Sequence, residues 1–342
     1  MAKVPTVCLT LYLCRYSRQQ MEELSRVGRV IVRTVSCPCG PAPGVGDGGE
    51  GELQVSAGQA MKRAESVGGR LIDLTRREPR GRDQVCPWDL VMTISQDPMD
   101  RAAAAWVIAD EIMVARADLD TLAFGLWREA AITGVKLVDK DREHVLNVAA
   151  PVFEANDTTG VTGYIGEWLW YLLTRDLTLN PGRSVEILDP PSSTVTDSGP
   201  DGLIIHRVED GAMGFVFRLW EMKKFTGTAA KPSDTIRGAW QQLNDNGAKY
   251  LSQMSWGGRY LAPDTRVFVS SLTRQWVDAQ ESSSGGVSLA LNAADVPETA
   301  FERSHRHFTT RTHEGALQGL VVAVDDLENF AKDVREYVWS AL

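Results

Sequence analysis

The second half of the chain shows the most regular alternation of hydrophobic and polar positions. Apolar residues recur at helical spacing over residues 160–174, which predicts a helix there. Three short apolar runs follow, and we predict strands at residues 184–188, 201–208 and 214–223. A short glycine-containing segment, residues 209–212, joins the last two runs and is typical of a β-hairpin.

The chain beyond this hairpin continues to mix helices and strands. A helical pattern covers residues 233–254, and Ser233 has the side chain expected of an N-cap. The later segments are predicted to be a strand at 266–272, a flexible Ser/Gly loop at 282–286, a strand at 317–324 and a helix at 326–342. Elements mixed in this way indicate an α/β fold with one sheet flanked by helices.

The first 150 residues are less regular. They contain a strand pattern at 7–14, a helical pattern at 18–32, a Pro/Gly-rich loop at 37–52, helical patterns at 55–74 and 100–131, and a basic loop at 76–82. No catalytic set of residues precedes residue 150. We therefore expect an N-terminal accessory domain, α/β or mostly helical, over residues 1–150 and a second domain over residues 151–342.

Composition indicates the cellular compartment in which we expect the protein. The 342 residues have ordinary globular proportions and contain no run of 18 apolar residues, so we expect no membrane span. The apolar residues 4–14 are interpreted as a buried strand rather than a signal peptide. Five cysteines, all within the first quarter, do not form a disulfide pattern, and Cys37 and Cys39 are too close for usual zinc spacing. These features favour the cytoplasm.

Charge is unevenly distributed along the chain. The net charge is −9, which argues against coating nucleic acid by bulk electrostatics. Residues 216–275, however, contain nine Lys and Arg against four acids, a local charge of +5. A basic face on an acidic body is compatible with local binding of nucleic acid.

Acidic residues and one lysine are placed at the ends of the predicted hairpin. Asp201 begins the first strand, while Glu221 and Lys223 end the second. Side chains alternate along a strand, so Glu221 and Lys223 point to the same face. A hairpin places the start of its first strand beside the end of its second, which brings Asp201 next to Glu221. Converging carboxylates beside a cation are what magnesium-assisted hydrolysis of a phosphodiester requires.

Pro200-Asp201 followed by Glu221-x-Lys223 at the end of the next strand resembles the PD-(D/E)XK nuclease superfamily. The resemblance covers roughly residues 155–275. It implies a restriction-endonuclease-like mixed sheet flanked by helices, with Asp201 and Glu221 binding Mg²⁺ (or Mn²⁺) and Lys223 positioning or activating water. By itself an acid two positions before a lysine is a weak signal, and the alternative for Glu221 and Lys223 is a surface ion pair.

The same resemblance implies further site residues. Many members carry an acid on the preceding helix, where Glu167 fits as a third catalytic and metal-binding residue. Glu167 is the one charge within residues 165–173, although a partly exposed helix face would also accommodate it. Many members also place a glutamine near the phosphates. The predicted nucleic-acid contacts are Gln241, Gln242, Lys224 and Arg237. The Gln-x-x-x-Tyr variant is not matched, because Tyr250 follows Gln242 by eight residues.

Two basic segments lie outside this set. Arg76, Arg77, Arg80 and Arg82 occupy one loop, and residues 303–313 contain three of the five histidines together with Arg311. Solvated surface is the leading interpretation of both segments, with phosphate contact as the alternative.

We therefore expect a metal-dependent nuclease that cleaves DNA. Its two-part layout is somewhat similar to effector nucleases of bacterial antiphage defence systems, such as HamA of Hachiman. That likeness implies a helicase or ATPase partner, because the chain has no P-loop. One alternative is a catalytically silent nucleic-acid-binding or assembly subunit with a nuclease-like fold. Another is a magnesium-dependent hydrolase of small phosphates.

Overall fold

The fold is taken from a computed structural model. It describes residues 54–82, 85–93, 97–153, 158–177, 182–191, 201–208, 214–227, 231–254, 256 and 260–342. Leu53–Leu342 form one compact unit. The predictions for residues 7–14, 18–32 and 37–52, including Cys37 and Cys39, lie outside the described residues, as do Pro200 and the hairpin turn at 209–212.

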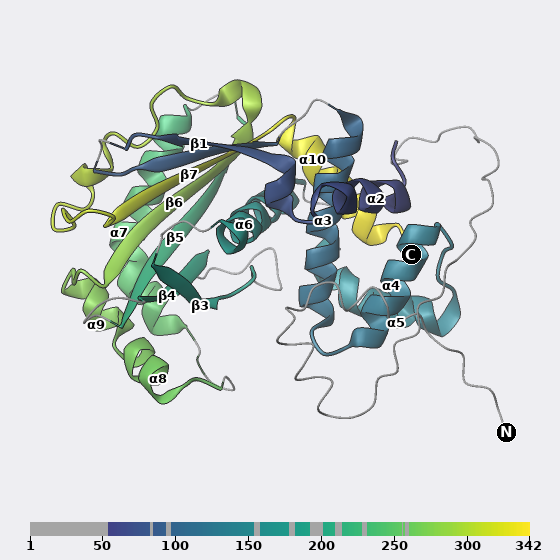
Figure 1. The fold of residues 1–342 in the computed structure, drawn as a ribbon, viewed down its shortest axis with the longest axis horizontal. Helices are drawn as coiled ribbons and strands as arrows, with labels where there is room; N and C mark the ends of the chain where they lie inside the picture. Colours follow the sequence, from purple (N-terminus) through teal and green to yellow (C-terminus); the bar gives the residue numbers. More distant parts are fainter. Residues whose placement is uncertain are drawn as a thin grey trace. The chain divides into compact units, whose positions relative to one another are not determined.

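The described residues build a seven-stranded mixed sheet in the order β1-β2-β7-β6-β5-β4-β3 (Figure 1). The strands are β1 Thr75–Arg80, β2 Trp88–Thr93, β3 Arg183–Leu188, β4 Gly202–Val208, β5 Phe215–Phe225, β6 Ser283–Asn292 and β7 Leu317–Val324. Strands β2, β7, β6 and β5 are mutually parallel, whereas β1, β4 and β3 pair antiparallel with their neighbours. The α/β class is confirmed.

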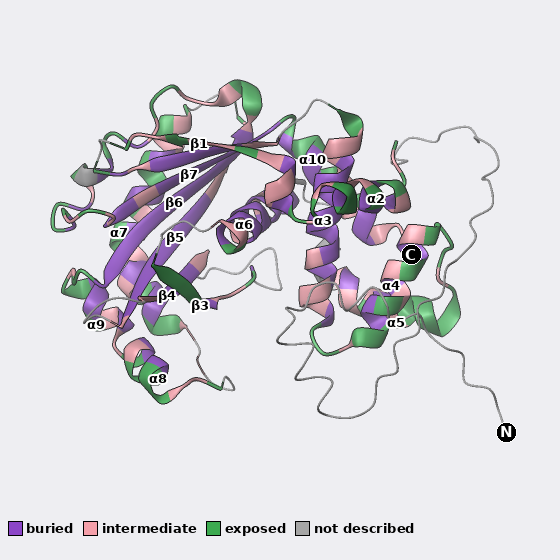
Figure 2. Ribbon diagram, in the orientation of Figure 1, coloured by how far each residue is buried: buried purple, intermediate pink, exposed green. Residues whose placement is uncertain are grey.

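Helices cover both faces of the sheet. The α-helices of the described residues are α2 Ala57–Val67, α3 Pro98–Ala117, α4 Thr121–Thr133, α5 Asp139–Phe153, α6 Thr158–Asp176, α7 Pro232–Gln253, α8 Pro263–Ser270, α9 Leu272–Val277 and α10 Leu327–Trp339. Helix α6 packs on one face with α3 and α10, and α7 packs on the other. The parallel strands are buried on both sides, as Figure 2 shows.

Several predicted elements are confirmed with adjusted ends. The helix at 160–174 is α6, and the three strands after it are β3, β4 and β5. The helix predicted over 100–131 is two helices, α3 and α4, because Asp118 takes a positive φ of 49° and the Asp120 side chain caps α4. The helix predicted over 55–74 ends at Gly68, whose φ is 130°.

The Ser/Gly segment at 282–286 is not a flexible loop, and that prediction was wrong. Residues 283–286 form the start of β6, a central strand buried along almost its whole length. Small residues are required there, because a Cβ on Gly286 would lie 2.4 Å from the Trp220 ring. Pairing with β5 and β7 satisfies the backbone that the small side chains leave exposed.

Three further predictions are corrected. Residues 266–272 form α8 and the start of α9 rather than a strand; Pro263 begins α8 and its buried residues, Thr265 and Val269, are four apart. Helix α7 begins at Pro232, so Ser233 lies within its first turn and is not the N-cap. The basic segment at 76–82 is mostly strand β1, at the edge of the sheet.

The sheet draws strands from both sides of residue 150. Strands β1 and β2 come from residues 75–93, yet they complete the same sheet as β3 to β7. The roles assigned to the two predicted domains stay predictions. Within the described residues, none of the helices is both long and apolar enough to cross a membrane.

Candidate active site

The β4–β5 hairpin brings Asp201 to Glu221. Gly202 pairs with Trp220, so the residue before Gly202 lies opposite the residue after Trp220. The Asp201 carboxylate is held in place because its Oδ2 accepts a hydrogen bond from the Met222 backbone N–H at 2.6 Å. The adjacency that the hairpin predicted is therefore confirmed.

Glu221 and Lys223 lie on the same face of β5 and form an ion pair through Oε1 and Nζ. The Glu221 side chain is fully buried, whereas 31% of the Lys223 side chain is exposed. The buried carboxylate is thus connected to the surface through the lysine. This geometry excludes the simple surface ion pair as a description of Glu221.

Glu167 approaches the same group from α6. Its pKa is raised to about 8 by burial and by the negative charge of Asp201, with Lys223 opposing the rise. The helix lies close to the sheet at this point because Gly166 has no side chain. A Cβ there would lie 3.3 Å from the Cβ of Ala290 in β6. The structure therefore brings together the four residues predicted from sequence.

The electrostatics of this group are dominated by crowded carboxylates. Burial, and then the charge of Asp201, raise the pKa of Glu221 to about 7. Burial also raises the pKa of Asp201, against the opposing charge of Lys223. Burial lowers the pKa of Lys223, but Glu221 and Asp201 outweigh this and the net shift is upward. Two adjacent buried acids beside one ammonium group, with the charge of Glu167 close enough to act on them, favour an additional proton or cation.

One atom marks where that cation would bind. Oε2 of Glu221 is buried and makes no hydrogen bond with any described residue. Asp201 and Glu221 are close enough to share a proton. An unpaired buried carboxylate oxygen is costly, so a proton or a metal ion is expected between the two side chains.

The donor set suits a hard divalent cation. Among the described residues there is no preassembled group of three metal-ligating side chains. Mg²⁺ commonly uses one or two carboxylates and retains several waters. Asp201 and Glu221 fit this mode, and Glu167 could contact the bound waters.

The sequence analysis missed Tyr250 in α7 as a site residue. Its hydroxyl accepts a hydrogen bond from Nε2 of Gln242 at 2.9 Å. Burial raises the pKa of Tyr250, and Glu221 and Asp201 add to the rise, so the phenol lies near the carboxylates. Eight residues make slightly more than two helical turns, which places Gln242 and Tyr250 on one face. The eight-residue spacing of Gln242 and Tyr250, which does not fit the Gln-x-x-x-Tyr motif, could therefore have identified Tyr250 from the sequence.

The other predicted nucleic-acid contacts are dispersed. Gln241 is exposed on α7, and exposed Arg237 pairs with Asp234 at 3.0 Å. Lys224 alternates with Lys223 and points to the opposite face of β5, where its side chain lies 4.0 Å from the Cβ position of Gly163. Contacts of these residues with DNA stay predictions.

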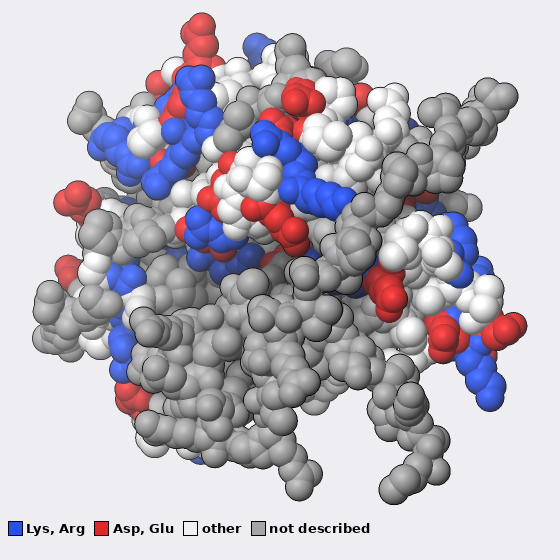
Figure 3. Space-filling view, turned by 45° about the vertical axis from the view of Figure 1, so that its right-hand side comes forward, with Lys and Arg blue, Asp and Glu red and all other residues white. Residues whose placement is uncertain are grey.

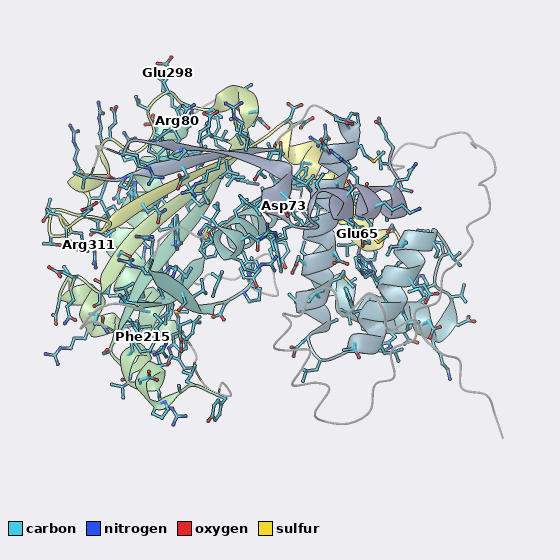
Figure 4. The ribbon with its side chains drawn as sticks, in the orientation of Figure 1. Glu65, Asp73, Arg80, Phe215, Glu298 and Arg311 are labelled. Atoms are coloured by element: carbon cyan, nitrogen blue, oxygen red, sulfur yellow. The ribbon has the colours of Figure 1, made fainter. Side chains whose placement is uncertain are left out.

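Arg311 has a structural role that its sequence context did not indicate. It is buried, and it donates to the backbone oxygens of Ser283 and Trp276 at 2.9 and 2.7 Å. Its guanidinium also lies 4.0 Å from the centre of the Trp276 ring. Figure 4 shows Arg311 at the end of the sheet where β6 begins. Surface exposure and phosphate contact are both wrong for this residue.

Comparison of the chain with models of known families, with curated proteins and with solved structures finds no match.

Proposed function

We propose that the protein is a metal-dependent nuclease that cleaves DNA, with the mixed sheet as a restriction-endonuclease-like core. The supporting observation is the buried, unpartnered Oε2 of Glu221 beside the Asp201 carboxylate. The order α6-β3-β4-β5-α7 agrees with the predicted succession of helix, three strands and helix, whereas α8 and α9 precede the next strand, β6. By the sequence resemblance, a role in bacterial antiphage defence with a helicase or ATPase partner belongs to the same proposal.

The residues divide the work of hydrolysis among them. Asp201 and Glu221 would hold Mg²⁺, which supplies Lewis acidity and lowers the pKa of a bound water. The Met222 N–H keeps the Asp201 carboxylate oriented toward Glu221. Lys223 reaches solvent, so its ammonium can hold the attacking water or a phosphate oxygen. Glu167, whose pKa is raised to about 8, would hold a proton near neutral pH and contact water from the α6 side.

The test is cleavage of plasmid and linear DNA with Mg²⁺, Mn²⁺ or EDTA. Asp201→Asn keeps the size of the side chain and an acceptor for the Met222 N–H but removes the charge. Lys223→Met keeps the length and removes the ammonium. Asp264→Asn, at an exposed acid of α8, is the matched control. We expect metal-dependent cleavage by the wild type and the control, and loss of cleavage in the two site variants. Equal cleavage by all four would refute the proposal.

Metal binding is measured separately by thermal unfolding. Mg²⁺ at about ten times its Kd would stabilise the wild type by about 1.4 kcal/mol. Asp201→Asn should show no such stabilisation. A shift of the same size in both proteins would place the metal elsewhere.

The second candidate function is a catalytically silent nucleic-acid-binding or assembly subunit, in which the Glu221 and Lys223 ion pair would serve the fold alone. DNA binding without cleavage, and without any Mg²⁺-dependent thermal shift, would support that function instead.

A further inference from the structure

The two basic segments singled out in the sequence come together in the fold. Arg80, at the end of β1, places its guanidinium 5.6 Å from the centre of the Trp88 ring in β2. Trp88 in turn lies 5.7 Å from the ring of Phe301. Ser304, three residues after Phe301, contacts Cys86. Cys86 precedes Trp88 by two residues. The aromatic contact therefore joins residues more than 200 positions apart.

This junction presents five arginines, four exposed and Arg80 half-buried, which we call the arginine surface. Its members are Arg76, Arg80, Arg82, Arg303 and Arg306. Figure 4 shows Arg80 at the top of the sheet, and Figure 3 shows Lys and Arg side chains gathered at the upper left of the face drawn there.

The arginine surface carries more positive charge than its acids neutralise. Glu78 is shared by Arg76 and Arg80. Asp89 is shared by Arg77 and Arg82, and its side chain is only 1% exposed. Each of these carboxylates therefore serves two guanidinium groups, which leaves a positive surplus.

The second segment adds further positive charge. Arg303 and Arg306 are exposed and make no ion pair within the described part of the chain. Exposed Glu298 and Glu302 lie in the same region of the sequence and offset part of this charge. Guanidinium groups without a carboxylate partner remain available to phosphate, which they bind through paired N–H groups.

The sheet connects this surface to the proposed active site. Arg80 pairs with Trp88, Trp88 with Gly319, Gly319 with Val287, and Val287 with Glu221. Arg80 and Glu221 are thus on one level of the sheet, four strand steps apart, or roughly 19 Å at about 4.8 Å a step. Duplex DNA that contacts both would extend at least about six base pairs at about 3.4 Å each.

We propose that the arginine surface binds the phosphate backbone of DNA some six or more base pairs from the phosphate at Glu221. The inference rests on the proposed function for its substrate. It names a binding surface that is separate from the carboxylates and from the basic stretch at 216–275. Arginine contacts with the backbone would hold DNA of any sequence.

The test measures binding apart from cleavage. Binding of a labelled 30-base-pair duplex is titrated in EDTA at several salt concentrations, with Asp201→Asn present in every protein. The test variant is Arg303→Glu with Arg306→Glu. The control is Lys140→Glu with Arg142→Glu, two exposed positions of α5 with the same change of charge. Duplexes of four to thirty base pairs are compared in a second series.

We expect the test variant to bind at least about tenfold more weakly, with the salt dependence reduced by about two ions, and the control to change little. The affinity of the Asp201→Asn protein should rise once the duplex exceeds about six base pairs, and this rise should be lost when Arg303→Glu and Arg306→Glu are added. Equal weakening by both variants, or no binding at all, would overturn the inference. So would stronger binding of polyglutamate than of DNA, which would assign the surface to an acidic protein.

The outcomes separate this inference from the proposed function. Arginine-dependent binding by a protein that never cleaves DNA would support the surface and contradict the nuclease. Metal-dependent cleavage that is unaffected by Arg303→Glu with Arg306→Glu would support the nuclease and contradict the surface.

Discussion

Glu221 and Asp89 are both buried carboxylates on parallel strands of the same sheet, but their surroundings differ. The Asp89 oxygens accept hydrogen bonds from the guanidinium groups of Arg77 and Arg82 at 3.0 Å. Glu221 is paired with Lys223 but lies beside the like-charged Asp201 carboxylate, and its second oxygen has no hydrogen-bond donor among the described residues. A fully paired carboxylate stabilises a fold as it stands, whereas a half-paired one is suited to bind something further.

The largest expected effect distinguishes these two acids by activity. Glu221→Gln retains the shape of the side chain and removes its charge, so it should lower DNA cleavage by roughly 10³-fold, the equivalent of about 4 kcal/mol. Asp89→Asn should leave the rate per folded molecule within about twofold of wild type. Cleavage is measured at saturating Mg²⁺ on one linear duplex. Comparable losses in both variants would remove the functional distinction.

The free energy of unfolding should fall more in Asp89→Asn than in Glu221→Gln, the reverse of their order in activity. Asp89→Asn weakens the charged hydrogen bonds to Arg77 and Arg82, whose side chains are partly exposed, and it should cost about 1.5–3 kcal/mol of unfolding free energy. Glu221→Gln should cost less, because it removes a carboxylate that is itself incompletely paired. Urea unfolding at pH 7 provides the measurement, with exposed Asp264→Asn as the control. A larger loss for Glu221→Gln would mean that the Lys223 pair is chiefly structural.

His206 extends the comparison to a buried base on β4. Its Nδ1 has no partner among the described residues, and its pKa is lowered to about 4 by burial, then by Arg218 and Arg183. The unfolded histidine takes up a proton near pH 6.5, before the folded one does. Stability should therefore be complete above about pH 6.5 and decline as pH falls toward 4, by about 2–3 kcal/mol in total.

His206→Gln should flatten this part of the stability curve. Urea unfolding at several pH values between 4 and 7.5 gives the curves. Parallel curves for wild type and His206→Gln would show that His206 is not the group responsible.

The smallest expected effect concerns Tyr250. Tyr250→Phe removes the hydroxyl that accepts from Gln242 and keeps the ring, so stability should fall by about 1 kcal/mol. If the phenol contributes to the active site, cleavage should also fall severalfold with an unchanged Mg²⁺ requirement. Gln242→Ala should reproduce the stability loss. An unchanged cleavage rate in both variants would restrict this hydrogen bond to a structural role.

Local patterns predicted much of the site and less of its surroundings. The strand alternation of Glu221 and Lys223, and the hairpin with Asp201, follow from short-range geometry, which the structure reproduces. The strand at Ser283–Asn292 was missed because its Ser and Gly residues have low strand propensity by themselves. They become a strand because two neighbours pair with it and Trp220 occupies the space that side chains would fill.

The sequence by itself determined that Asp201, Glu221 and Lys223 would meet, because a hairpin and a two-residue period leave little freedom. It also indicated, from one charge on an apolar helix, that Glu167 required a partner. Which buried polar groups are satisfied depends on the tertiary structure: Asp89 is paired by two arginines, Arg311 by backbone oxygens, and Glu221 by one lysine with the Asp201 carboxylate beside it. Periodicity is local, whereas the pairing of a buried charge depends on residues brought from distant parts of the chain.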